Sequence, residues 1–115
     1  MLVVSPLLLG MACLLDRDEE DEKVSLAWVS RYDGEGLSWE YATAIAVDQS
    51  GNVYVTGYSG SEMTDWDYCT VKYNKDGQQL WQRKYGGVDG KDDCAHDIEV
   101  DSLGNVYVTG YSQCE

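Results

Sequence analysis

The nine residues GNVYVTGYS at positions 51–59 occur a second time, letter for letter, at positions 104–112. The two copies are 53 residues apart, and the same offset continues upstream without a gap, since Trp28 aligns with Trp81. A fixed period near 50 residues is typical of a solenoid, a propeller or another array of stacked units. The sequence is therefore predicted to form a repeat protein.

Four stretches within one period are rich in β-branched and aromatic residues, which favour strands. They span residues 42–47, 52–58, 67–73 and 79–85. Short loops with a glycine near the end join the first to the second and the third to the fourth, as in β-hairpins. One period thus predicts an all-β fold with four-stranded antiparallel sheets, each the shape of a propeller blade.

The burial of these strands is expected to be graded. The first strand, ATAIAV at 42–47, is apolar on both faces and should be covered on both. Lys72 in the third strand and Arg83 and Lys84 in the fourth indicate strands further out. The first strand is therefore predicted to be the most buried.

These stretches resemble the bacterial SBBP family of β-propeller repeats. The family signature has an Ala-Ile-Ala-Val-Asp strand, then Ser-Gly-Asn-Val-Tyr-Val-Thr-Gly, then Asp-Tyr-x-x-x-Lys-Tyr and Leu-Trp. The corresponding segments here are 44–48, 50–57, 67–73 and 80–81. The second copy departs from the signature at Glu99 and Leu103. The resemblance implies exported or cell-surface proteins built from repeated blades, and it implies no catalytic residues.

The predicted repeats occupy residues 25–115. They comprise a partial blade at 26–32, a full blade at 42–85 and a partial blade at 95–111. A closed propeller needs four to eight blades, so we expect an incomplete β-propeller fragment. Its open strand edges and exposed apolar faces would favour association.

The first 13 residues, MLVVSPLLLGMAC, predict a signal peptide, because their apolar run is too short to span a membrane. The run ends at Ala12-Cys13, which resembles a bacterial lipoprotein processing site. Cys13 is therefore a candidate for lipidation and membrane attachment, and plain export with an incidental cysteine is the alternative. Residues 14–24 are strongly acidic and are expected to form a solvated tether. The predicted location is the outer membrane, the cell surface or the extracellular space.

The formal net charge is −13, from 21 acidic and 8 basic residues. Such a charge repels phosphate backbones, which argues against nucleic acid as a partner. The partners that remain open are a carbohydrate or a protein at the cell surface.

Two tryptophans are candidates for ligand binding. Trp39 and Trp66 are predicted to lie in the longer connections, beside Glu40, Asp65 and Asp67. Aromatic side chains next to acids can stack against sugars, but they can equally pack over the edge of a blade. Both interpretations remain open.

No catalytic residue, cofactor site or metal site is predicted. The chain has one histidine, His96, which supports no Ser-His-Asp or Cys-His arrangement. A zinc site made from His96, Cys94 and either Cys69 or Cys114 would match no usual ligand spacing. The cysteines do not recur with the repeat, so no disulfide framework is specified.

The predicted function is therefore that of a non-catalytic scaffold or binding module. Two alternatives remain open. The blades could be accessory repeats of a larger secreted enzyme, or they could form a structural or adhesive array at the cell surface.

Overall fold

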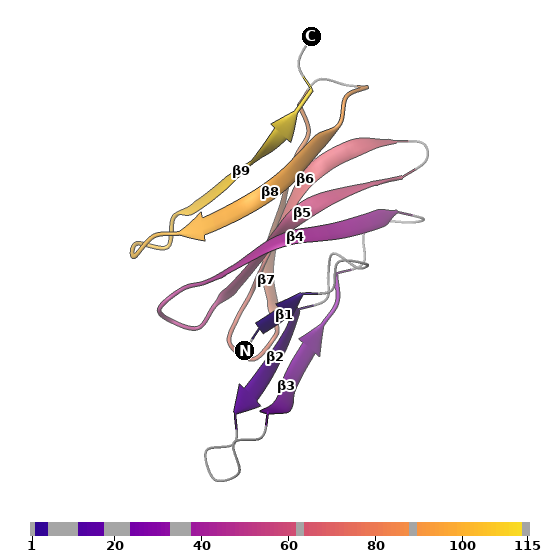
Figure 1. The fold of residues 1–115 in the computed structure, drawn as a ribbon. Coiled ribbons are helices and arrows are strands. Elements are labelled where there is room, and N and C mark those ends of the chain that lie inside the picture. Colours follow the sequence, from indigo (N-terminus) through magenta and orange to yellow (C-terminus); the bar gives the residue numbers. More distant parts are fainter. Residues whose placement is uncertain are drawn as a thin grey trace.

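The computed structural model describes residues 2–4, 12–17, 24–32, 38–61, 64–87 and 90–113. Within these ranges the chain forms three antiparallel sheets (Figure 1). The signal-peptide prediction falls largely on residues outside the described ranges. The described part has no helix long and apolar enough to cross a membrane.

The central sheet is the full blade. Its strands are β4 (Trp39–Val47), β5 (Val53–Ser61), β6 (Thr64–Tyr73) and β7 (Gln79–Tyr85), and they pair antiparallel in chain order. The prediction of a four-stranded antiparallel blade is confirmed. Strands β4, β5 and β6 are two to three residues longer than expected. Cross-strand pairing continues at the end of the blade where Glu40 pairs with Ser59.

The next repeat begins with β8 (Asp93–Val100) and β9 (Val106–Ser112), which form a two-stranded antiparallel sheet. It reproduces the β4–β5 hairpin closely. A β-bulge interrupts the register at Ala42/Ala44 in the first hairpin and at Ala95/Asp97 in the second. The two hairpins therefore share their local structure, although β4 and β8 differ at most aligned positions.

The N-terminal sheet contains β1 (Leu2–Val4), β2 (Ala12–Arg17) and β3 (Val24–Ser30). β2 lies between the other two strands. β3 covers most of the predicted first partial blade. Residues 14–17 of the predicted acidic tether lie in β2, while residues 18–23 are outside the described ranges.

One carboxylate organises the turn of each hairpin. The side chain of Asp48 accepts hydrogen bonds from the Ser50 and Asn52 backbone N–H groups, both at 2.9 Å, and from the Tyr54 hydroxyl at 3.0 Å. Asp101 is held in the same way by the equivalent groups, with the Asn105 N–H at 2.8 Å. An aspartate that bonds to backbone N–H groups beyond it is a standard way to shape a turn. These repeated acids are therefore structural.

The main core lies on one face of the full blade. Its buried side chains come from β5, β6 and the segment after β3: Tyr32, Val53, Val55, Cys69, Val71 and Tyr73. Trp28 of β3 packs against this cluster, with its ring centroid 6.2 Å from that of Tyr73. The preceding partial repeat thus covers one face of the blade.

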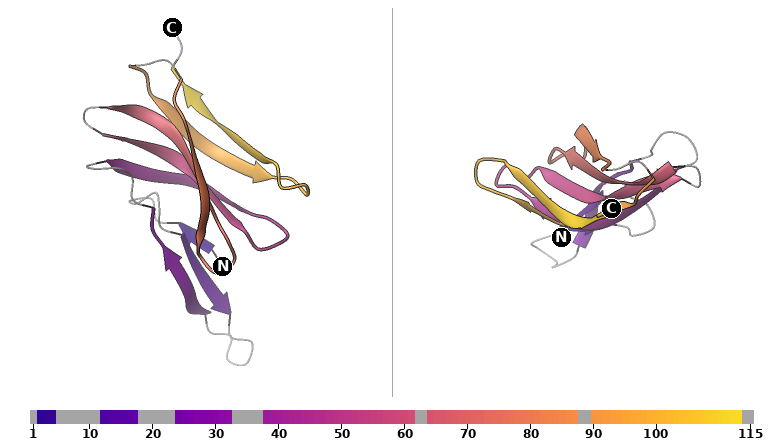
Figure 2. Two further views of the ribbon diagram at one scale, coloured as in Figure 1. Left: turned by 180° about the vertical axis from the view of Figure 1, so that it is seen from behind. Right: turned by 90° about the horizontal axis from the view of Figure 1, so that it is seen from above.

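The next repeat covers the opposite face. β8 packs across β4, β5 and β6 (Figures 1 and 2), and it buries Ala95 and Ile98 in the contact. Thr43, the extra residue of the β4 bulge, donates a hydrogen bond to the Ala95 carbonyl at 2.7 Å. The full blade is therefore held between parts of two neighbouring repeats, as blades are in a propeller.

The expected gradient of burial is wrong for the first strand. β4 is partly exposed, with Val47 50% accessible, whereas β5 carries the most buried residues and Val71 and Tyr73 of β6 are also buried. The reason is position, because β5 and β6 have a strand on each side and β4 forms an edge of its sheet. β7 is exposed, as its charged residues indicate.

Gly77→Ala and Gly104→Ala are expected to differ in cost although both glycines have φ above +80°. Both substitutions carry a left-handed penalty of about 1–2 kcal/mol. At Gly77 an added Cβ would also come within 2.7 Å of the Trp28 indole, whereas nothing lies within 4 Å at Gly104. Chemical unfolding should show a larger loss of stability for Gly77→Ala. Equal losses would mean that Trp28 does not pack on this turn.

Candidate functional site

The two candidate tryptophans lie in strands and not in the longer connections, which corrects their predicted location. Trp39 is the first residue of β4, and Trp66 lies near the start of β6. β4 and β6 both flank β5, which brings the two residues together although 27 positions separate them in the chain. Their rings stack with centroids 6.0 Å apart and an interplanar angle of 24°.

Two tyrosines complete what we term the aromatic cluster: Trp39, Tyr41, Tyr58 and Trp66. Tyr41 and Tyr58 stack at 5.1 Å, and Trp66 meets the two tyrosines edge-on at 5.5 and 5.3 Å. Such offset and edge-to-face contacts suit the charge distribution of aromatic rings. Trp39 remains 48% exposed and Tyr41 37% exposed. The cluster therefore has packed inner rings and an accessible outer surface.

The absence of a side chain at Gly60 makes the tryptophan stack possible. Gly60 pairs with Trp39 in the β4–β5 ladder, and the Trp66 indole lies directly over it. A Cβ at this position would come within 2.9 Å of the Trp66 ring and 2.8 Å of the Asp65 carbonyl oxygen. A glycine here lets Trp66 cross β5 and reach Trp39.

Acidic side chains tie the aromatic cluster to the connection before β8. Asp92 accepts a hydrogen bond from the Trp66 N–H at 3.2 Å, and Asp65 accepts one from the Gly90 N–H at 2.7 Å. Within the described ranges no group of three His, Cys, Asp or Glu side chains is arranged to hold a metal ion. Both acids thus accept hydrogen bonds from backbone N–H groups.

The sequence prediction missed Tyr41 and Tyr58. A usable signal was present, because Trp39 and Tyr41 are two apart on one strand and therefore share a face. The offset of 53 residues supplies a second signal. Trp39 aligns with Asp92 and Tyr41 with Cys94, so these two residues are not part of the repeated framework, whereas Tyr58 recurs as Tyr111.

Beside the cluster, a buried acid recurs in both repeats. Glu40 pairs with Ser59 across β4 and β5, and Asp93 pairs with Ser112 across β8 and β9. Both acids are buried. Hydrogen bonds from the Ser112 hydroxyl and the Gly87 N–H lower the pKa of Asp93. In its charged form, Asp93 thus holds Gly87, which lies in the connection between β7 and β8.

Stability is expected to fall at acid pH. Hydrogen bonds to Asp101, with the one from the Asn105 side-chain amide the largest cause, lower the pKa of this carboxyl group. The pKa of Asp93 is lowered as well. The stabilisation from such acids is complete above their ordinary pKa of 3.8 and is lost as pH falls through the lower folded value. The melting temperature should therefore drop between about pH 4 and pH 2.

Two variants separate the effect of these hydrogen bonds from the effect of a change in net charge. Asp101→Asn should reduce the acid-induced drop, whereas Asp76→Asn, an equal charge change in an exposed turn, should leave it intact. A melting temperature that rises toward pH 2 would contradict the prediction. It would show that relief of repulsion in a chain of net charge −13 outweighs these hydrogen bonds.

Cys69 and Cys94 are both free thiols. Burial raises the pKa of Cys69 to about 11, which keeps it in the unreactive protonated form at neutral pH. The backbone of Cys13 lies in β2, and its lipidation stays a prediction. Cys114 lies outside the described residues.

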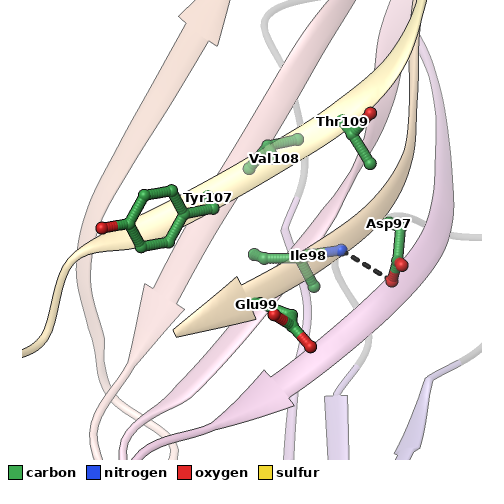
Figure 3. Close-up of a pocket in the computed structure, with 6 residues that line it drawn as sticks. All are labelled: Asp97, Ile98, Glu99, Tyr107, Val108 and Thr109. Carbon is green, nitrogen blue, oxygen red and sulfur yellow. Dashed lines mark hydrogen bonds between the residues drawn. The ribbon is translucent and has the colours of Figure 1, made fainter. Parts of the chain in front are cut away.

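A shallow hollow lies on the outer face of the β8–β9 sheet (Figure 3). Its lining residues are Asp97, Ile98, Glu99, Tyr107, Val108 and Thr109. It is open and sits on a two-stranded sheet, and it is separate from the aromatic cluster. In the full blade, the positions equivalent to Tyr107 and Thr109 are buried.

Comparison with protein families matches residues 41–62 and 83–113 to the SBBP beta-propeller repeat. The first segment holds most of the β4–β5 hairpin, and the second runs from β7 through β9. The chain therefore carries repeats of the SBBP beta-propeller family, as its sequence pattern predicts. No curated protein matches the chain.

Proposed function

We propose that this chain is a non-catalytic binding module of an exported or cell-surface protein, and that its aromatic cluster contacts a carbohydrate. The observation that carries the proposal is the stacked pair of Trp39 and Trp66, with Trp39 48% exposed at the end of the blade. A large exposed indole held rigidly by other rings offers a flat apolar surface at low entropic cost.

The surroundings of the cluster favour this use over simple packing. Trp66 and Tyr58 fill the inner positions, whereas Trp39 stacks on Trp66 from outside and stays 48% exposed. Asp65 and Asp92 lie at its border with partly exposed carboxylates. Carboxylates beside an aromatic surface can accept hydrogen bonds from sugar hydroxyls while the ring contacts the sugar's C–H face.

The export part of the proposal rests on the apolar run at residues 1–12 and on the acidic segment after it. Two of the three strands before the blade, β1 and β2, are drawn from this region. The high negative charge is consistent with a soluble surface outside the cell.

Trp39→Ala is expected to weaken retention on polysaccharides by at least about tenfold, the equivalent of 1.4 kcal/mol. Affinity electrophoresis against a panel of neutral, amino and acidic polysaccharides would measure it. Tyr85→Ala is the matched control, because Tyr85 is 59% exposed on β7 of the same sheet but is not part of the aromatic cluster. It should bind like the wild type.

Two results would refute the proposal. One is a wild-type chain that is retarded by none of the polysaccharides. The other is a Trp39→Ala variant that is retarded as strongly as the wild type. A change of melting temperature in Trp39→Ala would be checked in parallel, so that loss of folding is not mistaken for loss of binding.

A further inference from the structure

The aromatic cluster lies at an acidic end of the full blade, the end where β4 begins and β5 ends. Strands β4, β6 and β8 and the connection before β8 bring five carboxylates to this end: Glu40, Asp65, Asp67, Asp92 and Asp93. Two lysines lie among them, because Lys84 donates to the Ser59 hydroxyl at 3.3 Å and Lys91 directly precedes Asp92. The negative charge here exceeds the positive charge, so this end attracts cations and repels anions.

Two of these acids, Asp65 and Asp92, lie close together at the border of the aromatic cluster. Their hydrogen bonds are reciprocal, since Asp65 binds the N–H of Gly90, two residues before Asp92, and Asp92 binds the N–H of Trp66, which follows Asp65. Two carboxylates held near each other repel, and a bound cation relieves that repulsion. The place between the two acids therefore favours a positively charged group.

Each of the two acids keeps an acceptor for a ligand. Asp65 uses its Oδ2 atom and Asp92 its Oδ1 atom for the backbone N–H groups. A carboxylate has two oxygens with several lone pairs, so one such bond does not saturate it. Both side chains are half-buried, so they remain in part accessible from outside. The backbone bonds also fix the two carboxylates in place, which reduces the entropic cost of binding.

An ammonium group suits this combination of rings and carboxylates. The face of an indole attracts a cation, and an ammonium group binds a carboxylate more strongly than a hydroxyl does. The full blade already contains two contacts between a cation and a ring, with Lys72 at 5.0 Å from the Tyr54 centroid and Arg83 at 5.5 Å from that of Trp81. Trp39, 48% exposed, offers the same kind of surface to a cation from outside.

We propose that the aromatic cluster binds a cationic amino sugar, with the sugar ring on Trp39 and its free amine at the Asp65 and Asp92 carboxylates. The inference rests on the proposed function, because it specifies the class of carbohydrate at the same site. A neutral sugar gains the stacking but not the charged hydrogen bonds, and N-acetylation removes the charge from the same amine. An acidic sugar meets the negative charge at this end of the blade.

Two tetrasaccharides that differ only in acetylation test the proposal: the tetramer of glucosamine and the tetramer of N-acetylglucosamine. Their binding to the full chain is followed by quenching of tryptophan fluorescence at about pH 5.5, where aspartates are ionised and the sugar amines are protonated. The glucosamine tetramer should bind at least about tenfold more tightly, in line with hydrogen bonds to charged groups. The preference should shrink as ionic strength rises from about 0.02 to 0.5 M, because salt screens partly exposed charges.

Three charge variants locate the preference. Asp65→Asn and Asp92→Asn should each reduce it at least about threefold, while the asparagine amide oxygen still accepts the backbone N–H bond. Asp76→Asn makes the same charge change in the exposed turn between β6 and β7 and should keep the full preference. This control separates contact with the two acids from the general attraction of a cation by a chain of net charge −13. Trp39→Ala leaves the net charge unchanged and should weaken the binding of both tetrasaccharides.

The outcomes distinguish this inference from the proposed function. Equal affinity for the two tetrasaccharides, or tighter binding of the acetylated one, overturns the amino-sugar assignment while Trp39-dependent binding of carbohydrate stands. A preference that survives both Asp65→Asn and Asp92→Asn, or that falls as much in Asp76→Asn, also overturns it. So does a tetralysine peptide that binds at the cluster in place of the amino sugar, which would assign the site to a protein partner. A chain that binds no saccharide at all rejects the proposed function itself.

Discussion

Replacing Tyr54 with alanine is expected to lower the free energy of unfolding by about 3–5 kcal/mol, the range for large buried aromatic side chains. Tyr54 is 1% exposed on the face that β8 covers. Its ring lies edge-on to Trp81 at 6.0 Å and under the Lys72 ammonium group at 5.0 Å. The substitution would remove all of these contacts and leave a cavity between the two blades.

Tyr107→Ala is the matched control, because Tyr107 occupies the same place in an identical stretch of sequence. It is 60% exposed, so its loss should cost only a small fraction of the Tyr54 effect. Urea unfolding would compare the two variants. Equal losses would contradict the burial of Tyr54, since this residue has the Trp81 and Lys72 contacts of the full blade, whereas Tyr107 lies in a two-stranded sheet without equivalents of β6 and β7 among the described residues.

Trp28→Ala is expected to cost about 3 kcal/mol, because it removes a large ring from the opposite face of the blade. The indole packs on Tyr73, and its Nε1–H donates to the Lys75 carbonyl at 2.9 Å. Trp28 comes from the N-terminal sheet, so the variant also tests whether that sheet stabilises the blade. Loosening of this segment should also increase access to the buried Cys69 thiol, because Tyr32, four residues after Trp28, contacts Cys69.

Two measurements check the effect of Trp28. Urea unfolding should show the loss of stability, and a thiol reagent should label Cys69 faster in the variant than in the wild type. Trp81→Ala, the repeat-equivalent change on exposed β7, should cost less and should leave Cys69 protected. A stable Trp28→Ala variant with an unlabelled Cys69 would show that β3 does not cover the core.

The candidate site could be predicted only in part. Trp39 and Trp66 stand out as aromatic residues beside acids, but their distance in the chain gives no sign that they touch. They meet because β5 lies between their strands and has a glycine at position 60. Tyr41 and Tyr58 join them for the same reason, since cross-strand pairing puts the two tyrosines opposite each other. Both tryptophans were predicted to lie in loops because the extension of β4, β5 and β6 by cross-strand pairing was not predicted from the sequence.

The sequence by itself determined the hairpins of both repeats. The strand positions, the bulge in each first strand and the Asp48 and Asp101 turns depend on residues fewer than about 20 positions apart, so both copies form them alike. Burial was decided only by the tertiary structure. The segment VYVTGYS is buried in β5, which has a strand on each side and a repeat on each face. It is largely exposed in β9, because burial depends on neighbours that a local sequence does not carry.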